Sequence, residues 1–175
     1  MTPAPRILVV MGVSGSGKTT IGVNLAQRLG WPFLEGDDLH PPANVAKMHG
    51  GTPLTDADRW PWLDAIRAWI DARLAGDEHA DGGHGVVACS ALRRAYRERL
   101  GVGRNGVAVV FLHADRALLA DRLVRRKGHF MPPALLDSQL ATLEPPAPEE
   151  HPITVDIGGT ADAVVADILE HLNAA

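Results

Sequence analysis

A short apolar run followed at once by a glycine-rich loop constrains this 175-residue chain more than any other feature. Residues 7–11 are all apolar, as in a buried strand, and residues 12–19 read Gly-Val-Ser-Gly-Ser-Gly-Lys-Thr. The apolar spacing of Ile21, Leu25 and Leu29 then predicts a helix over residues 17–29. A strand, this loop and a helix in that order form a phosphate-binding P-loop, a motif of parallel α/β sheets.

The loop residues suit a triphosphate bound with magnesium. Glycines let backbone N–H groups turn inward around a phosphate, and the helix that follows adds its positive N-terminus. We expect Lys18 to neutralise the β- and γ-phosphates and the Thr19 hydroxyl to face Mg²⁺. No Asn-Lys pair exists to begin a guanine-reading element, so ATP is the expected nucleotide. The predicted phosphate contacts are Gly12, Ser14, Gly15, Ser16, Gly17, Lys18, Thr19 and Thr20.

The rest of the chain alternates between strand and helix patterns. Further strands are predicted at residues 32–34, 86–89, 107–113 and 153–157. Helices are predicted at residues 43–48, 55–74, 93–100, 115–126, 133–143 and 161–172, with Thr55 and Asp58 suited to cap the second of these. The alternation predicts an α/β fold with a parallel sheet, and the length predicts a single domain over residues 1–175.

Charge and composition exclude several classes of partner. Lys and Arg total 17 against 21 acids, a formal charge of −4, and no basic run tracks a nucleic-acid backbone. No apolar run approaches the roughly 18 residues of a membrane span, and residues 7–11 are too short for a signal peptide. Cys89 is the only cysteine, which fits a reducing compartment. We therefore expect a cytoplasmic protein that binds neither membrane nor nucleic acid.

Acidic residues follow the second predicted strand. The carboxyl ends of parallel strands face the ligand crevice, so Glu35 and Asp37 should lie near the bound phosphates and, on an extended segment, point the same way. Glu35 would hold the water shell of Mg²⁺. Asp37 would take the proton from the hydroxyl group of the acceptor. The alternative is an acidic turn that caps the next helix, a role that suits Asp38 better.

Polar and cationic residues in three segments suit a polyol acid as acceptor. Hydrogen-bonding groups for hydroxyls are expected from Asp37, His40 and Ser90, and cations for a carboxylate from Lys47, Arg59 and Arg94. Three alternatives stay open: Arg59 pairs only with Asp56 or Asp58, Lys47 is merely solvated, and Arg93 replaces Arg94. Three tryptophans near this region are better explained as core or interface than as stacking platforms: Trp60, Trp62 and Trp69.

A basic stretch precedes a segment flanked by glycine and proline. Arg122, Arg125, Arg126 and Lys127 end a predicted helix, and cations on such a flap can reach the transferring phosphoryl group. Compensation of the helix dipole explains only one or two of these charges. His129 either touches the acceptor or packs the flap. After the last strand, Gly159 either leaves room for adenine or forms a plain turn.

Taken together, these motifs resemble the gluconokinase family. The residues that carry the resemblance cover most of the chain in the expected order, and only the P-loop is common to many other kinases. They are the P-loop, residues 36–41 (Gly-Asp-Asp-Leu-His-Pro), Asn44, Lys47 and Met48, residues 51–63, residues 89–97 and residues 126–130.

The resemblance implies a specific reaction and architecture. The reaction is transfer of the γ-phosphoryl group of ATP to the 6-hydroxyl of D-gluconate, and the fold is the three-layer, five-stranded nucleoside-kinase type. The acceptor would bind a helical region at about residues 38–75 under a helical lid at about residues 126–138. A homodimer is implied, with Arg126 as charge stabiliser beside Lys18 and Asp37, and Arg122 near the nucleotide.

Two rival functions stay open. One is a kinase of another acceptor, such as shikimate, although shikimate kinases carry a glycine triplet where this chain has Ser90-Ala91-Leu92. The other is a nucleotide-binding regulatory module without turnover, because the P-loop by itself does not make an enzyme.

Overall fold

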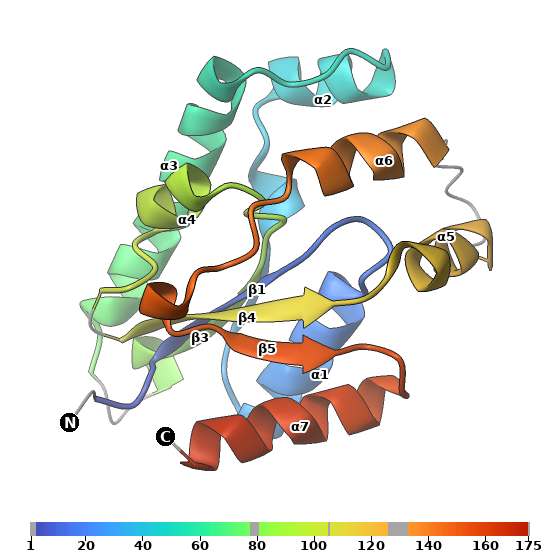
Figure 1. Cartoon of the computed structure of the whole chain (residues 1–175). Coiled ribbons are helices and arrows are strands. Elements are labelled where there is room, and N and C mark those ends of the chain that lie inside the picture. The colour runs from blue at the N-terminus through green and yellow to red at the C-terminus, as the bar shows by residue number, and fades with distance from the viewer. Residues whose placement is uncertain (1–2, 78–80, 105, 126–132, 175) are drawn as a thin grey trace.

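A five-stranded parallel sheet forms the centre of the molecule (Figure 1). The computed structural model describes residues 3–77, 81–104, 106–125 and 133–174. The strand order is β2-β3-β1-β4-β5, and every pair is parallel. The strands are β1 (Ile7–Met11), β2 (Phe33–Glu35), β3 (Gly85–Ala88), β4 (Val107–His113) and β5 (Ile153–Asp156). The predicted α/β class with a five-stranded parallel sheet is confirmed.

Helices cover both faces of the sheet and give three layers (Figure 1). They are α1 (Lys18–Leu29), α2 (Pro42–His49), α3 (Asp56–Leu74), α4 (Arg94–Leu100), α5 (Arg116–Arg125), α6 (Pro133–Thr142) and α7 (Ala161–Ala174). Most bounds lie within one or two residues of the predicted ones. Three short 3₁₀ turns add η1 (Gly36–Leu39), η2 (Asp81–Gly83) and η3 (Pro148–Glu150). Within the described ranges, no helix is long and apolar enough to cross a membrane.

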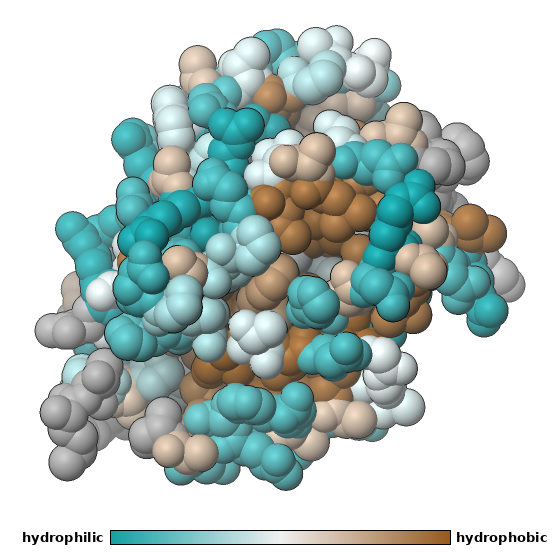
Figure 2. All heavy atoms as spheres, in the orientation of Figure 1, coloured by the Kyte–Doolittle hydropathy of each residue, from teal (hydrophilic) through white to brown (hydrophobic). Residues whose placement is uncertain are grey.

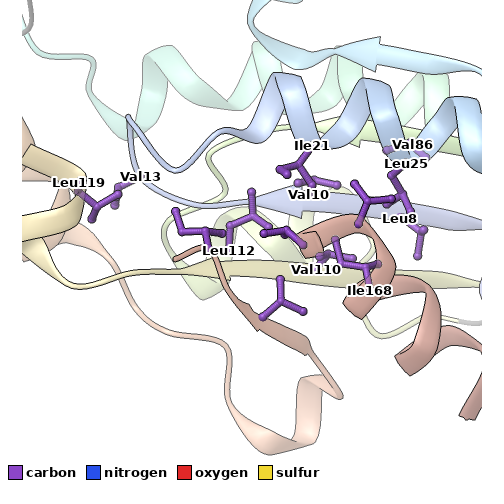
Figure 3. Close-up of a cluster of buried hydrophobic side chains, with 14 of the residues drawn as sticks. Leu8, Val10, Val13, Ile21, Leu25, Val86, Val110, Leu112, Leu119 and Ile168 are labelled. Carbon is purple, nitrogen blue, oxygen red and sulfur yellow. The ribbon is translucent and has the colours of Figure 1, made fainter. Parts of the chain in front are cut away.

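The central strand β1 is buried on both faces, and its side chains alternate between two apolar clusters. Leu8 and Val10 pack with Leu25 of α1 on the face that α7 also covers (Figure 3). The other three β1 side chains pack with the apolar side of α3 and with α4: Ile7, Val9 and Met11. This alternation follows from the two-residue period of a strand. It places the loop after β1 at the middle of the carboxyl edge of the sheet.

Helix α3 begins with the predicted cap and buries aromatic rings. The Thr55 hydroxyl accepts from the Asp58 backbone N–H, and the Asp58 side chain accepts from the Thr55 N–H, which completes a capping box. Trp62 is 3% exposed and donates its indole N–H to the Gly36 carbonyl at 2.7 Å. Trp62 therefore belongs to the core, as predicted, and it ties α3 to the end of β2.

The chain after β2 departs from the expected extended geometry. Gly36 begins the 3₁₀ turn η1, so Glu35 and Asp37 do not share one face of a strand. A Cβ atom on Gly36 would lie 2.5 Å from the Ala88 carbonyl oxygen and 3.2 Å from Ile66 Cδ1. Only a residue without a side chain allows β2 to approach β3 and α3 so closely, and the chain turns there.

This close approach predicts a local sensitivity to size. Gly36→Ala should lower the free energy of unfolding by about 1–3 kcal/mol, because backbone on β3 must move to admit the methyl group. Gly82→Ala is the matched control, since a Cβ atom at Gly82 meets nothing within 4 Å. Chemical denaturation of both variants measures the difference. Equal stability of the two variants would contradict the tight packing at Gly36.

Candidate active site

The loop between β1 and α1 forms an anion cradle at the carboxyl edge of the sheet. Gly15 and Gly17 have φ angles of +86° and +87°, which side-chain-bearing residues rarely adopt. Gly17 is the N-cap of α1 and makes no side-chain cap, so no side chain competes for the first amides of the helix. Uncapped amides and the positive end of the helix dipole favour an anion at this point.

A cavity of about 430 Å³ opens over the cradle. It brings together most of the predicted nucleotide, metal and catalytic residues, and with them Arg125, one of the four cations predicted near the transferring phosphoryl group. The lining residues are Ser14, Gly15, Gly17, Lys18, Thr19, Thr20, Glu35, Asp37, Arg122 and Arg125. The turn at η1 thus still directs Glu35 and Asp37 to one cavity, although by a different backbone path from the one expected.

Two predicted phosphate contacts lie behind the cavity wall instead. Ser16 is fully buried, and its backbone N–H donates to the Val13 carbonyl at 3.2 Å. Gly12 is also buried, and a Cβ atom there would come within 2.6 Å of Ser16 Oγ. Neither residue lines the cavity, and their contact with phosphate stays a prediction. They shape the loop from beneath, since the chain must fold back tightly there.

Hard oxygen ligands meet at one wall of the cavity. The Thr19 hydroxyl at the start of α1 donates to the Glu35 carboxylate at the end of β2. Hydroxyl and carboxylate oxygens are ligands that Mg²⁺ accepts, together with phosphate oxygens and water. The pair therefore fits the predicted magnesium role. Lys18 folds back along the loop, with its Nζ 3.2 Å from the Val13 carbonyl oxygen.

Asp37 reaches the cavity from η1 with 70% of its side chain exposed. Its neighbour His40 is only 4% exposed and stacks on Trp62 with ring centroids 4.0 Å apart. The Asn44 amide nitrogen donates to the Asp58 carbonyl and lies 3.2 Å from His40 Nδ1. Because that nitrogen can only donate, Nδ1 accepts and the ring proton lies on Nε2, 3.9 Å from Asp37.

Burial also affects the protonation of His40. Desolvation lowers the pKa of His40, the Asp37 charge opposes this shift, and Arg59 adds to it. The stacked ring supports the base of the turn that carries Asp37. Its predicted hydrogen bond to an acceptor hydroxyl stays a prediction.

Lys47 is tied to the start of α3 rather than standing as an isolated cation. Its ammonium lies 2.7 Å from the Asp58 carboxylate. The hydrogen bond from Lys47, with help from the Thr55 backbone, lowers the pKa of Asp58 to about 2. Lys47 keeps 40% of its side chain exposed, and its charge is locally balanced by an ionised partner.

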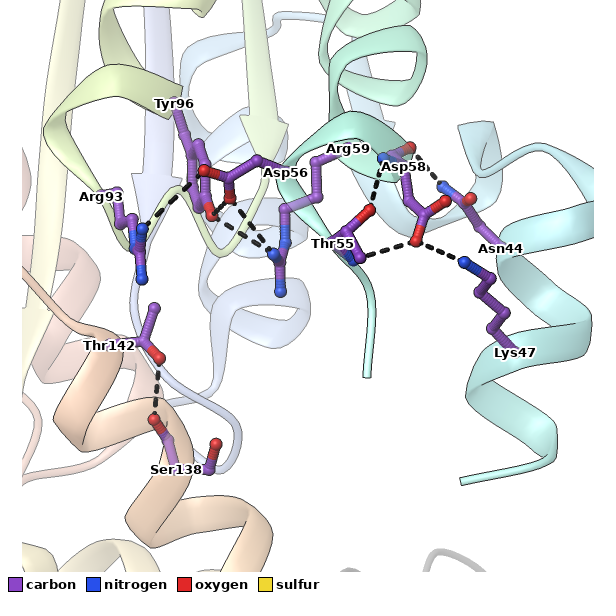
Figure 4. A network of polar contacts seen from close by, with 10 residues as sticks. All are labelled: Asn44, Lys47, Thr55, Asp56, Asp58, Arg59, Arg93, Tyr96, Ser138 and Thr142. Atoms are coloured by element: carbon purple, nitrogen blue, oxygen red, sulfur yellow. Dashed lines mark hydrogen bonds and ion pairs between the residues drawn. The ribbon is translucent and has the colours of Figure 1, made fainter. Parts of the chain in front are cut away.

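A second cluster holds two guanidinium groups around one carboxylate (Figure 4). Asp56 lies 3.6 Å from Arg59 and 3.8 Å from Arg93, and it accepts a hydrogen bond from the Tyr96 hydroxyl. Arg59 also donates to the Tyr96 oxygen at 3.2 Å. Arg59 therefore pairs with Asp56, as one alternative predicted, but it also contacts Tyr96. Two cations against one acid leave a positive excess, which favours a further carboxylate.

Arg93, not Arg94, lies in this cluster. Arg94 points to acids on another side of α4, at 2.8 Å from Glu149 and 3.2 Å from Glu98. These ion pairs favour Arg93 over Arg94 as the acceptor contact, the alternative that the sequence left open. Adjacent residues at the start of a helix point in directions about 100° apart, and the sequence did not reveal which one faces the sheet edge.

The residues after β3 lie close to the same edge. Ser90 is half-buried, and Ala91 adopts a positive φ of 45° that Arg97 supports by donating to its carbonyl at 2.9 Å. Burial raises the pKa of Cys89 to about 12, so this thiol stays protonated and inert.

Helix α5 forms one side of the cavity and is tied to the segment after β5. Arg122 lines the cavity, and its guanidinium donates to the Ile157 carbonyl. Gly159 is exposed and does not line the cavity, and Gly158 donates to the Asp156 carboxylate at 2.7 Å in a tight turn. The segment forms a tight turn, and adenine binding at Gly159 stays a prediction. Arg126 and His129 lie outside the described residues, as does most of the predicted lid at residues 126–138.

Gln139 contacts the cradle, and sequence reasoning missed it. Its side-chain oxygen accepts from the Ser14 backbone N–H at 2.7 Å, and its nitrogen donates to the Ser14 hydroxyl at 3.0 Å. These residues are 125 positions apart, and a lone glutamine in a helix carries no motif. Asp56 and Tyr96 were likewise not assigned to the site.

Comparisons with known proteins agree with this geometry. A family model described as an AAA domain matches residues 7–146. The gluconokinase of Gluconobacter oxydans (strain 621H) is 53% identical over 97% of this chain and 93% of its own length. The crystal structure of a gluconokinase from Sinorhizobium meliloti 1021 has a TM-score of 0.85 and 48% identity, covering 98% of this chain and 93% of that one.

A more distant likeness concerns the fold alone. Shikimate kinase from Acinetobacter baumannii, solved with shikimate, has a TM-score of 0.60 at 18% identity, covering 97% of this chain and 94% of that one. Similarity of sequence over nearly the whole length is far stronger for the first two proteins. The P-loop, the cavity over it and these full-length matches together show that this chain belongs to the gluconokinase family.

Proposed function

We propose that this chain transfers the γ-phosphoryl group of ATP to the 6-hydroxyl of D-gluconate. The observation that carries the proposal is that Asp37 and the P-loop line one cavity in a chain of this family. A carboxylate opposite the phosphates lets an alcohol lie between a base and the group it attacks. The shared fold of shikimate kinase supports a phosphoryl transfer but not a choice of acceptor.

In the proposed reaction, the chain positions groups and neutralises charge. Asp37 orients the acceptor hydroxyl and takes its proton as the oxygen attacks in line. Lys18 and the α1 amides bind the phosphates, and Arg122 and Arg125 lie at the same cavity to offset developing charge. Mg²⁺, when bound, would neutralise phosphate oxygens, with Thr19 and Glu35, the latter through water, holding it. Arg126 is proposed as a further charge stabiliser.

The carboxylate of gluconate is proposed to bind the two guanidiniums around Asp56. Arg59 and Arg93 keep 27% and 46% of their side chains exposed, so both remain accessible to a ligand. Planar guanidiniums bind carboxylates with paired hydrogen bonds. Ser90 and Lys47 are proposed to contact hydroxyls at the border of this region. A homodimer, as the family resemblance implies, and a cytoplasmic location, as the sequence predicts, complete the proposal.

An acceptor panel tests the function directly. With ATP and Mg²⁺, we expect gluconate to produce ADP rapidly and shikimate, nucleoside monophosphates and related sugar acids to produce little. Coupled measurement of ADP release, with phosphogluconate identified by mass, checks this. Faster turnover with shikimate would favour the rival kinase, and nucleotide binding without acceptor-dependent turnover would favour a regulatory module.

Asp37→Asn tests the proposed base. We expect kcat to fall at least about a hundredfold, because the amide cannot accept the hydroxyl proton, while the KM for ATP stays close to wild type. Asp38→Asn is the matched control, since Asp38 is an exposed neighbour in the same turn that does not line the cavity. Near-normal turnover of Asp37→Asn would remove Asp37 from this role.

Arg93→Gln tests the carboxylate site. We expect the KM for gluconate to rise about tenfold or more with the KM for ATP unchanged, because a charge-assisted hydrogen bond is lost. Arg94→Gln, whose parent side chain pairs with Glu149, should leave both constants near wild type. Initial-rate kinetics over both substrates measures this. A larger rise in the KM for gluconate in Arg94→Gln than in Arg93→Gln would instead indicate that Arg94 binds the carboxylate.

A further inference from the structure

Helix α6 is held against the phosphate loop by one side chain with two hydrogen bonds. Gln139 accepts from the Ser14 N–H at 2.7 Å and donates to Ser14 Oγ at 3.0 Å. Leu136, one turn earlier on the helix, is buried in the core. An apolar hollow of about 140 Å³ next to α6 is lined in part by Val13, Leu140 and Leu143, and Figure 2 shows apolar surface beneath this helix. Gln139 thus makes a polar contact beside the apolar side chains with which α6 packs.

The direction of each hydrogen bond follows from chemistry alone. The Ser14 backbone N–H can only donate, so the amide oxygen of Gln139 must face it. The amide nitrogen then faces Ser14 Oγ, and because that nitrogen can only donate, the hydroxyl oxygen must accept. The hydroxyl proton is therefore turned away from Gln139. No protein acceptor for this proton is found among the described residues, and Ser14 lines the cavity.

Helix α6 links the phosphate loop to the region where the carboxylate of the acceptor is proposed to bind. The residue two positions after the end of α6, Glu144, donates its N–H to the Leu92 carbonyl at 2.8 Å, next to Arg93. Figure 4 shows the Thr142 end of α6 near Arg93, and Figure 1 shows α6 passing over the loop that follows β1. A transferable phosphate must lie on that side of the cradle, between the loop and the acceptor.

We propose that Gln139 is a positioning residue that turns the Ser14 hydroxyl toward the terminal phosphate of ATP. Gln139 itself does not touch the nucleotide. By occupying one of the two acceptor lone pairs of Ser14 Oγ and binding the Ser14 backbone N–H, it keeps the hydroxyl proton away from Gln139 and leaves it free to point into the cavity that Ser14 lines. Ser14 then donates to the group that distinguishes ATP from ADP. The inference rests on the proposed ATP-dependent transfer and adds a residue to it.

The ratio of ATP to ADP affinity tests this, because a merely structural role would weaken both nucleotides alike. Ser14→Ala should reduce affinity for a non-hydrolysable ATP analogue about tenfold relative to ADP, the scale of a hydrogen bond to a charged group. Gln139→Leu, similar in size but unable to hydrogen-bond, should produce a similar loss of preference. Titration calorimetry with the full chain measures both constants, and thermal unfolding verifies that each variant is folded.

Three further variants complete the test. Ser14→Thr retains the hydroxyl and should keep the preference for the ATP analogue. The double variant Ser14→Ala with Gln139→Leu should lose no more preference than Ser14→Ala alone, because the donor is already absent. Ser138→Ala, an exposed neighbour of Gln139 on α6, is the control and should match wild type.

Several outcomes would overturn the inference. An unchanged ratio in Gln139→Leu, or equal weakening of both nucleotides, would show that Gln139 only packs α6. Additive losses in the double variant would show that the two residues act separately. Absence of nucleotide binding by the wild-type chain is a different result, because it would contradict the proposed function itself.

Discussion

The uncapped N-terminus of α1, placed at the carboxyl end of a fully buried central strand, is the constraint on which the site depends. Gly17 provides the turn into the helix and offers no side chain to its first amides. The partial positive charge at this helix end favours an anion. Because β1 lies at the centre of a parallel sheet, the ends of β2, β3 and β4 surround this point and bring other groups to it.

Charges in the proposed acceptor region, at the start of α3 and α4, are held in ion pairs. Lys47 faces Asp58, and Arg59 and Arg93 share Asp56. Such pairing holds long cationic side chains in place before a ligand arrives, which reduces the conformational entropy lost on binding. The shared acid leaves one guanidinium charge in excess near the proposed acceptor. That local imbalance, rather than the net charge of −4, suits an anionic sugar acid.

Local patterns predicted the fold and much of the site well. The strand runs, the cap at Thr55 and the P-loop are short-range signals, and each appears in the structure at or near its predicted position. The sequence was less informative about the direction in which a given side chain points. Arg93 and Arg94 are adjacent in the sequence, yet Arg93 pairs with Asp56 and Arg94 with Glu149. His40 is buried by stacking on Trp62, which lies 22 positions away in the chain.

The sequence by itself determined the class of protein, because a strand, a glycine-rich loop, a lysine and a helix encode the phosphate cradle within consecutive residues. Only the tertiary structure decided which distant side chains complete the site. Gln139 meets Ser14, and Tyr96 meets Asp56, because sheet order and helix packing bring separate segments together. Such contacts leave no periodic trace in the chain, since they depend on the direction of individual side chains rather than on hydrophobic spacing.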